Sequence, residues 1–160
     1  MSVSIRLMFD EDMEPIVQLS LLAWAPVFDS FQQVLGERIY ALMYPNWKRQ
    51  QQEVVEKYCR DEQTIVYVAN VDGRVAGFIT YTINDEDKTG EVDLLAVHPE
   101  YQNRGIGTEL NTFVFERMKE RGIKLAVVGT GGDPGHAPAR RSYEKAGYIG
   151  LPLMRYYKDL

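Results

Sequence analysis

Hydrophobic positions predict that the first part of the chain is helical. Between residues 12 and 60, apolar side chains recur every three or four positions, as on one face of an amphipathic helix. Pro26 and Pro45 interrupt this spacing, and a proline inside a helix removes one backbone hydrogen bond. We therefore predict three helices here, after a short strand over residues 3–8. Their apolar positions are Met13, Ile16, Val17, Leu21 and Trp24, then Phe31, Val34, Leu35, Ile39 and Leu42, then Trp47, Val54, Val55 and Tyr58.

After residue 63 the pattern becomes typical of strands. Residues 64–69 and 75–83 are rich in β-branched and aromatic side chains, and Asp72-Gly73 between them is a hairpin turn signal. A third apolar run covers residues 91–97. Strands joined by short turns pair antiparallel, so these three runs predict an antiparallel meander.

A helical spacing returns over residues 106–118 and is followed by a short buried strand over residues 125–128. A strand, a helix and a strand in this order imply a parallel crossover. Pro138 is well placed in the first turn of one more helix. The residues after it, 148–157, have the composition of a final strand, interrupted near Pro152.

These elements predict an α/β protein of the α+β kind, with a mixed, mostly antiparallel sheet flanked by helices. The length of 160 residues fits a single domain over residues 1–160. The net charge of −5, without a dense Lys/Arg cluster, argues against a nucleic-acid partner. The first residues lack the long apolar run of a signal or membrane anchor, so we expect a cytoplasmic protein without a membrane partner.

Few side chains can form a metal site. Cys59 is the one cysteine, which excludes an internal disulfide and makes a cysteine-based metal site improbable. His98 and His136 are the only histidines. We therefore predict no bound metal.

The segment HPEYQNRGIGTEL, His98–Leu110, joins the third strand of the meander to the next helix. A glycine turn before a helix N-terminus presents unpaired N–H groups to an anion such as a phosphate. A P-loop would need a GK[ST] sequence that is missing here, and the third glycine of a dinucleotide fingerprint is replaced by Leu110. Two common nucleotide loops are therefore excluded.

The spacing that does match is Q-x-x-G-x-G, from Gln102 to Gly107. Together with LLAVHPEY, ERGI and ARRSYEKAGY in this order, it makes the region from Glu91 to Ile149 similar to the GCN5-related N-acetyltransferase (GNAT) family. The resemblance implies the GNAT fold and acetyl-coenzyme A as acetyl donor. It also implies acetyl transfer to a primary amine of a small molecule or peptide, by direct attack in a ternary complex.

The resemblance further implies where acetyl-coenzyme A is held. The glycines let the backbone approach the pyrophosphate, and backbone groups of the preceding strand hold the pantetheine and polarise the thioester carbonyl. His136 stands where the family often has asparagine, and Arg140 and Arg141 either meet the 3′-phosphate or are exposed charges. The implied cofactor-binding residues are Leu95, Ala96, Val97, Gln102, Asn103, Arg104, Gly105, Ile106, Gly107, Thr108 and His136.

Two catalytic side chains are implied in the same way. An alkyl ammonium has a pKa of roughly 10, so attack near neutrality benefits from a base, which we assign to Glu91, with Asp93 or a water relay as alternatives. Before any bulge is considered, both carboxylates share a strand face with Leu95 and Val97. Tyr143 is the candidate acid that protonates the departing thiolate.

Aromatic residues in the first helices can line an acceptor pocket, although most of them are also candidates for core packing. A second interpretation is an acyl-coenzyme A-binding sensor or regulatory module without turnover. Such a binder needs the glycine loop but neither titratable group, so Glu91 and Tyr143 favour the enzyme. A second copy of the chain, forming a homodimer, is a candidate partner. The aromatic residues are Trp24, Phe28, Phe31, Tyr40, Tyr44 and Trp47.

Overall fold

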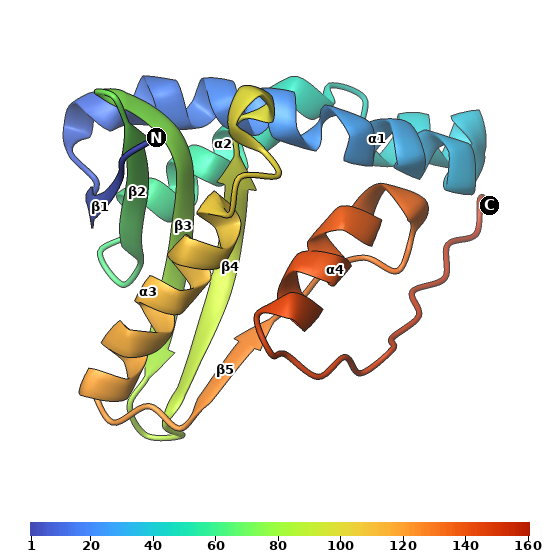
Figure 1. Ribbon diagram of the computed structural model, residues 1–160. Helices are drawn as coiled ribbons and strands as arrows, with labels where there is room; N and C mark the ends of the chain where they lie inside the picture. The colour runs from blue at the N-terminus through green and yellow to red at the C-terminus, as the bar shows by residue number, and fades with distance from the viewer.

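The computed structural model describes residues 1–160, which are arranged around one five-stranded sheet (Figure 1). The first four strands pair antiparallel in chain order, and the fifth pairs parallel with the fourth. This confirms the predicted mixed, mostly antiparallel sheet and its parallel crossover. The strands are β1 (Val3–Leu7), β2 (Ile65–Val71), β3 (Arg74–Asn84), β4 (Thr89–Val97) and β5 (Leu125–Val128).

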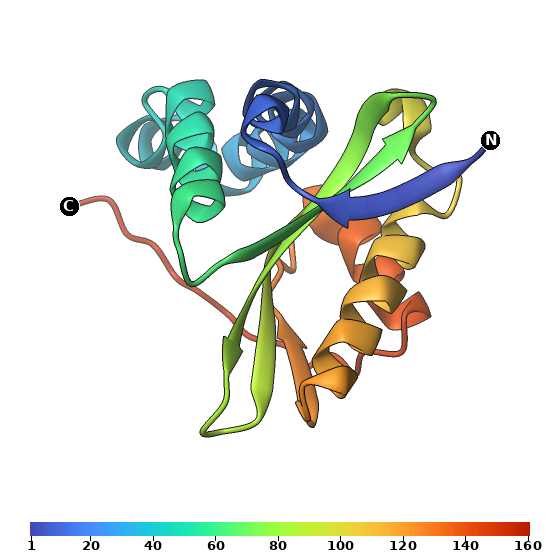
Figure 2. The ribbon, with the colours of Figure 1, turned by 90° about the vertical axis from the view of Figure 1, so that its left-hand side faces the viewer.

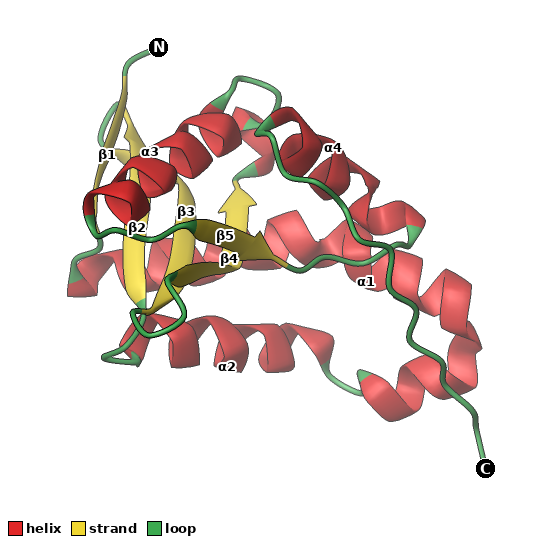
Figure 3. Cartoon of the chain, turned by 90° about the horizontal axis from the view of Figure 1, so that it is seen from below, coloured by secondary structure: helices red, strands yellow, loops and turns green.

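Helices cover both faces of the sheet. The long α1 (Met13–Met43) and α2 (Trp47–Arg60) lie on one side, whereas α3 (Ile106–Glu120) and α4 (Ala137–Lys145) lie on the other, as Figure 2 and Figure 3 show. Three short 3-10 turns precede α1, α3 and α4: η1 (Asp10–Asp12), η2 (Pro99–Tyr101) and η3 (Pro134–His136). None of the helices combines the length and apolarity needed to cross a membrane.

The two faces of the sheet bury separate hydrophobic clusters. On the α3 side, side chains such as Ile79, Tyr81 and Val92 pack against Leu110 and Val114 of α3. On the α1 and α2 side the buried residues are Ile16, Val17, Leu19, Val55, Val66, Val68, Phe78 and Ala96. Because β-strand side chains alternate between faces, the three central strands β2, β3 and β4 contribute to both clusters.

The prediction that Pro26 separates two helices is wrong. Residues 13–43 form one helical element with Pro26 inside it, and the backbone leaves helical geometry at Gly36, with φ 79° and ψ 163°. Pro26 lies on an exposed position, as does Leu22, whose carbonyl would have accepted the missing hydrogen bond. Water can satisfy that carbonyl, so the proline is tolerated, whereas the positive φ at Gly36 favours glycine.

The predicted final strand over residues 148–157 is also absent. The last backbone hydrogen bond of this region runs from the Tyr148 N–H to the Tyr143 carbonyl, and residues 149–160 form no ladder with any strand. The segment instead runs from the end of α4 to the far end of α1 (Figure 1), where Asp159 pairs with Arg38. An apolar, β-rich sequence forms a strand only where a neighbouring strand accepts its hydrogen bonds.

Candidate active site

The loop between β4 and α3 folds back onto the strand that precedes it. The side-chain amide of Gln102 donates to the Val97 carbonyl at 3.0 Å, which fixes the start of the loop. Asn103 and Gly105 then adopt positive φ angles of 61° and 85°, which turn the chain into α3. The exposed Arg104 guanidinium lies 5.7 Å from the centre of the Tyr101 ring. The motif thus forms a tight turn at the end of β4.

The N-terminus of α3 presents uncommitted backbone donors. The first helical hydrogen bond runs from the Glu109 N–H to the Gly105 carbonyl at 2.9 Å, and no side chain caps the helix. The N–H groups of Ile106, Gly107 and Thr108 therefore have no protein acceptor, and they lie at the positive end of the helix dipole. This arrangement favours an anion such as a pyrophosphate.

Space is open in front of these donors. A methyl group placed on Gly107 would lie 3.8 Å from both Ser142 Oγ and Val97 Cγ2, which is ordinary contact, and one on Gly105 would meet nothing within 4 Å. Packing within the protein therefore does not require a glycine at residue 107. A ligand that approaches the backbone closely would require one, so the residues present fit a pyrophosphate.

The end of β4 offers a second set of unpaired backbone groups. β4 pairs with β5 only from Thr89 to Val92, after which the two strands diverge (Figure 1). Residues 93–97 therefore have no strand neighbour on the β5 side, although residues 94–97 still pair with β3 on the other. Leu95, Ala96 and Val97, predicted to hold pantetheine, lie in this part of β4. An extended ligand can add here as a strand would.

A β-bulge in β4 corrects the predicted orientation of its side chains. Thr80 of β3 is opposite Leu94 and Tyr81 is opposite Val92, so Asp93 is the extra residue. The Leu94 N–H donates to Thr80 Oγ1 at 3.0 Å. Beyond the bulge, β4 side chains that would have pointed to one face of the sheet point to the other, because the strand contains one extra residue. Glu91 and Asp93 therefore do not share a face with Leu95 and Val97, which pack on the α3 side.

The two carboxylates instead belong to the α2 side of the sheet and differ in environment. Burial, together with the charge of the exposed Glu91, raises the pKa of Asp93 to about 6, and a hydrogen bond from Thr82 partly opposes this rise. The buried Oδ2 atom of Asp93 has no hydrogen-bond partner. Burial also raises the pKa of Tyr58 on α2, to which the charges of Asp93 and Glu91 contribute. Asp93 is thus a carboxylate that can exchange a proton near neutrality.

Tyr143 lies on α4, next to Ser142, the residue whose Oγ faces Gly107. Its ring centre is 5.7 Å from that of Tyr148, and Tyr148 in turn is 5.4 Å from Phe115 on α3. Burial raises the pKa of Tyr143 to about 12. The phenol is therefore protonated near neutrality and can act as a hydrogen-bond or proton donor.

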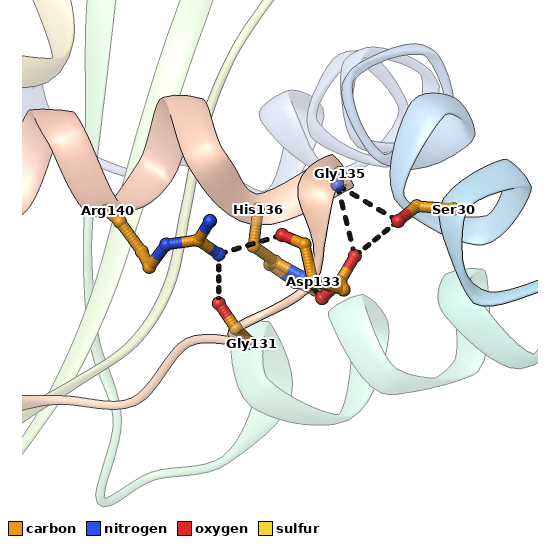
Figure 4. Close-up of polar contacts among 6 residues, drawn as sticks. All are labelled: Ser30, Gly131, Asp133, Gly135, His136 and Arg140. Atoms are coloured by element: carbon orange, nitrogen blue, oxygen red, sulfur yellow. Dashed lines mark hydrogen bonds and ion pairs between the residues drawn. The ribbon is translucent and has the colours of Figure 1, made fainter. Parts of the chain in front are cut away.

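A polar network anchors the loop before α4 to α1 (Figure 4). Oδ2 of Asp133 accepts hydrogen bonds from Ser30 Oγ at 2.6 Å and the Gly135 N–H at 3.1 Å, while Oδ1 contacts His136 Nδ1 at 2.5 Å. Burial opposes ionisation of Asp133, but the hydrogen bonds from Ser30 and His136 outweigh it, and the pKa of Asp133 is lowered. Asp133 is thus held as a carboxylate that joins two distant segments.

This network narrows the predicted roles of His136 and Arg140. Nδ1 of His136 is engaged by Asp133, so only Nε2 is left for a ligand. Arg140 donates to the carbonyls of Gly131 and Asp133, both at 2.7 Å, so it braces the loop. Arg141 remains the exposed candidate for a phosphate.

Sequence reasoning missed Ser30 and Asp133. Asp133 caps η3, with its side chain accepting from the Gly135 N–H, and an aspartate before Pro-Gly is a recognisable signal of such a cap. Ser30 gives no comparable signal, because its partner is 103 residues away in the sequence.

Aromatic side chains gather where α1, α2 and η3 meet. Phe28 stacks on Trp47 with ring centres 4.6 Å apart, and Phe31 stacks on Tyr44 at 5.4 Å. Phe31 also lies 5.5 Å from the His136 ring, which connects this aromatic cluster (Phe28, Phe31, Tyr44, Trp47) to the Asp133 network. Phe28 is buried, whereas the other three are partly exposed. They can therefore contact a small molecule.

Comparison with known proteins decides the family. The family model described as "Acetyltransferase (GNAT) family" matches residues 31–148. The chain belongs to this family. The resemblance inferred from the Q-x-x-G-x-G loop is thus confirmed.

Relatives of this GNAT chain carry several names. It is 29% identical over 83 residues to mycothiol acetyltransferase from Streptomyces coelicolor, covering 52% of this chain and 26% of that protein. It is 26% identical over 149 residues to S-(2-succino)cysteine N-acetyltransferase from Bacillus subtilis, covering 90% of this chain and 82% of that protein. The chain spans 26%, 48% and 27% of the length of three of the curated relatives it matches.

Solved structures confirm the predicted GNAT fold. The PaiA N-acetyltransferase from Thermoplasma acidophilum, in complex with coenzyme A, superposes with a TM-score of 0.71 at 21% identity. The match covers 93% of this chain and 91% of that chain.

Proposed function

We propose that this GNAT chain transfers the acetyl group of acetyl-coenzyme A to a primary amine of a small molecule or peptide, by direct attack in a ternary complex. The observation that carries the proposal is the junction of an uncapped α3 N-terminus with the unpaired end of β4. The α3 N-terminus suits the pyrophosphate of the donor, and the unpaired end of β4 suits its amide-containing pantetheine arm. The donor thioester then lies beside β4.

In this reaction the amine nitrogen forms a bond to the acetyl carbon while the carbon–sulfur bond breaks. We assign acceptance of the amine proton to the carboxylate pair of β4, with Asp93 preferred over Glu91. The pKa of about 6 leaves Asp93 mostly ionised near neutrality but basic enough to take a proton, whereas Glu91 is exposed. Tyr143 donates its proton to the departing thiolate.

His136 and the aromatic cluster belong to the acceptor side of this proposal. Asp133 orients the imidazole, so that Nε2 can hydrogen-bond to a polar group of the donor or the acceptor. The partly exposed rings of Phe31 and Tyr44 supply apolar contact area next to it. This combination suits an amine on a compact molecule with an apolar part.

The test is release of free thiol from acetyl-coenzyme A across an amine panel. The names of the relatives guide the panel, which includes S-(2-succino)cysteine, other amino acids, polyamines, aminoglycosides and short peptides. We expect amine-dependent thiol release with at least one of these classes. A protein that binds acetyl-coenzyme A but releases no thiol with any of them would be an acyl-coenzyme A sensor, the alternative function.

A further inference from the structure

A carboxylate and an imidazole form a fixed pair at the start of α4. Oδ1 of Asp133 contacts Nδ1 of His136 at 2.5 Å, and the two side chains are only 11% and 15% exposed. The other carboxylate oxygen accepts hydrogen bonds from Ser30 Oγ and the Gly135 N–H (Figure 4). Neither side chain of the pair can therefore turn without breaking a hydrogen bond.

Two glycines of the preceding loop, GTGGDPGH, are required by this pair. A methyl group on Gly131 would lie 2.5 Å from His136 Nδ1, and one on Gly135 would lie 2.6 Å from Ser30 Cβ. Non-bonded atoms do not approach so closely, so a side chain at either position would push the loop away from the imidazole or from α1. The loop is thus fitted closely around the pair.

The hydrogen bonds decide which nitrogen of His136 carries the proton. The pKa of Asp133 is lowered, so near neutrality its side chain is a carboxylate and can only accept. Nδ1 is then the donor, which leaves the lone pair of the neutral ring on Nε2. When Nε2 takes a proton, the same carboxylate stabilises the positive ring. An imidazole held in this way is a proton acceptor.

The imidazole adjoins the aromatic cluster and the helix that carries the candidate acid. Its ring is 5.5 Å from Phe31. Tyr143 follows His136 by seven residues, about two helical turns, so both side chains leave the η3–α4 segment on the same side. The other ionisable groups beside the pair are Tyr44 of α1 and Arg140 of α4, which bonds to two loop carbonyls. A base at His136 would therefore share one helical face with the acid.

We infer that His136 is a second general base, which takes the first proton of the acceptor ammonium ion through Nε2, and that Asp133 positions it. The inference rests on the proposed acetyl transfer, which it deepens. An alkyl amine has a pKa of roughly 10, so near neutrality it arrives as an ammonium ion that cannot attack the thioester. This nitrogen has to lose two protons on its way to an amide.

The two protons take separate routes. The first passes to Nε2 of His136 and from there to solvent. The second passes to Asp93 as the nitrogen–carbon bond forms. The carbon–sulfur bond then breaks, the sulfur takes the proton of Tyr143, and Tyr143 recovers a proton from Asp93 through solvent. One proton is released in total for each acetyl group transferred.

¹⁵N NMR of the labelled imidazole rings tests the tautomer in the absence of any acceptor. Above neutral pH, His136 should carry its proton on Nδ1. His98, the other histidine, is an internal control, because its Nδ1 accepts from the Glu100 N–H at 3.1 Å and its proton should therefore be on Nε2. A proton on Nε2 of His136 in the native protein would overturn the inference.

Asp133→Asn should reverse the tautomer of His136. The Gly135 N–H can only donate, so it holds the amide oxygen of the new side chain and turns the NH2 group toward Nδ1 of His136. Nδ1 must then accept, and the proton moves to Nε2, which no longer acts as a base. A variant that kept the proton on Nδ1 would refute the positioning role of Asp133.

Acceptors of different basicity distinguish a base from a structural residue. The probes are β-phenylethylamine, a compact amine with an apolar part, and its β,β-difluoro analogue, a much weaker base that is assayed above its own pKa. His136→Asn can still bond to Asp133 through its amide nitrogen. It should lower kcat/KM at least about a hundredfold for the first amine but less than about tenfold for the second, which has already lost its proton. If a panel amine is turned over faster, it and its fluorinated analogue replace this pair.

The outcomes separate this inference from the proposed function. Equal losses for the two amines, with the native protein active, would make His136 a structural residue and would overturn the inference alone. A native protein that releases no thiol with the probes or with any amine of the panel would remove the proposed function, and the inference with it.

Discussion

Replacement of Asp93 by Asn should stabilise the protein at neutral pH while lowering its activity. Asn has nearly the shape of a protonated aspartic acid, so the substitution mainly removes the charge. In the native protein, burial raises the pKa of Asp93 from its ordinary value of 3.8 to about 6. The folded state therefore binds the proton more tightly than the unfolded state, and folding stability falls as the pH rises from 3.8 to 6.

The size of this effect follows from the two pKa values. A difference between 3.8 and about 6 corresponds to about 3 kcal/mol if the site were fully shielded from solvent. Asp93 is only partly buried, so screening by solvent reduces the expected gain to about 1–2 kcal/mol. Above pH 6 the variant gains this amount over the native protein, and below about pH 4 the two should have equal stability.

Urea unfolding of both proteins at pH 4 and pH 7.5 measures the difference in the free energy of unfolding. The control is Glu91→Gln, which removes an exposed carboxylate two residues away and should change stability by less than about 0.5 kcal/mol. In parallel, kcat/KM of the native protein should rise with pH around a midpoint near 6, and this rise should be absent in the Asp93→Asn variant. An equal stability difference at both pH values would show that the buried charge is not the cause.

Three other predictions concern the donor loop, the candidate acid and the Asp133 network. Gly107→Ala should leave the melting temperature unchanged, because the added methyl group finds only 3.8 Å contacts, but should weaken coenzyme A binding in calorimetry by at least about tenfold. Unchanged affinity would mean that no ligand approaches this backbone. Tyr143→Phe should lower kcat by about a hundredfold with little change in the Kd for acetyl-coenzyme A, measured by stopped-flow turnover and calorimetry, and full turnover would remove the assigned acid. Asp133→Asn should lower the free energy of unfolding by about 1–3 kcal/mol at pH 7, since it weakens bonds to Ser30 and His136, and this loss should shrink as the pH falls below 4. This last prediction would be contradicted if chemical denaturation gave the same loss in the free energy of unfolding at pH 3 as at pH 7.

The parts of the molecule that the sequence predicts well are those in which neighbouring residues determine the structure. The turn at Asp72-Gly73 and the loop from Gln102 to Gly107 depend on local backbone preferences, and both occur as predicted. The alternating strands and their order follow from side-chain periodicity for the same reason.

The missed features depend on residues that are distant in the sequence. The bulge at Asp93 is a property of the register between two strands, and no pattern within β4 specifies it. The bond from Ser30 to Asp133 requires α1 and η3 to be packed first. The missing strand after residue 148 shows the same limit, since strand propensity does not supply a neighbour.

The divergence of β4 from β5 also links substrate supply to the lifetime of the folded protein. Residues 93–97 lack a neighbour on one side, so their amide hydrogens on that side should exchange quickly with deuterated solvent in the free protein. A donor molecule that occupies the gap would slow this exchange and, at a hundred times its Kd, would add about 2.7 kcal/mol to the free energy of unfolding. A cell rich in acetyl-coenzyme A would then hold more of this protein, because fewer molecules would open to proteases.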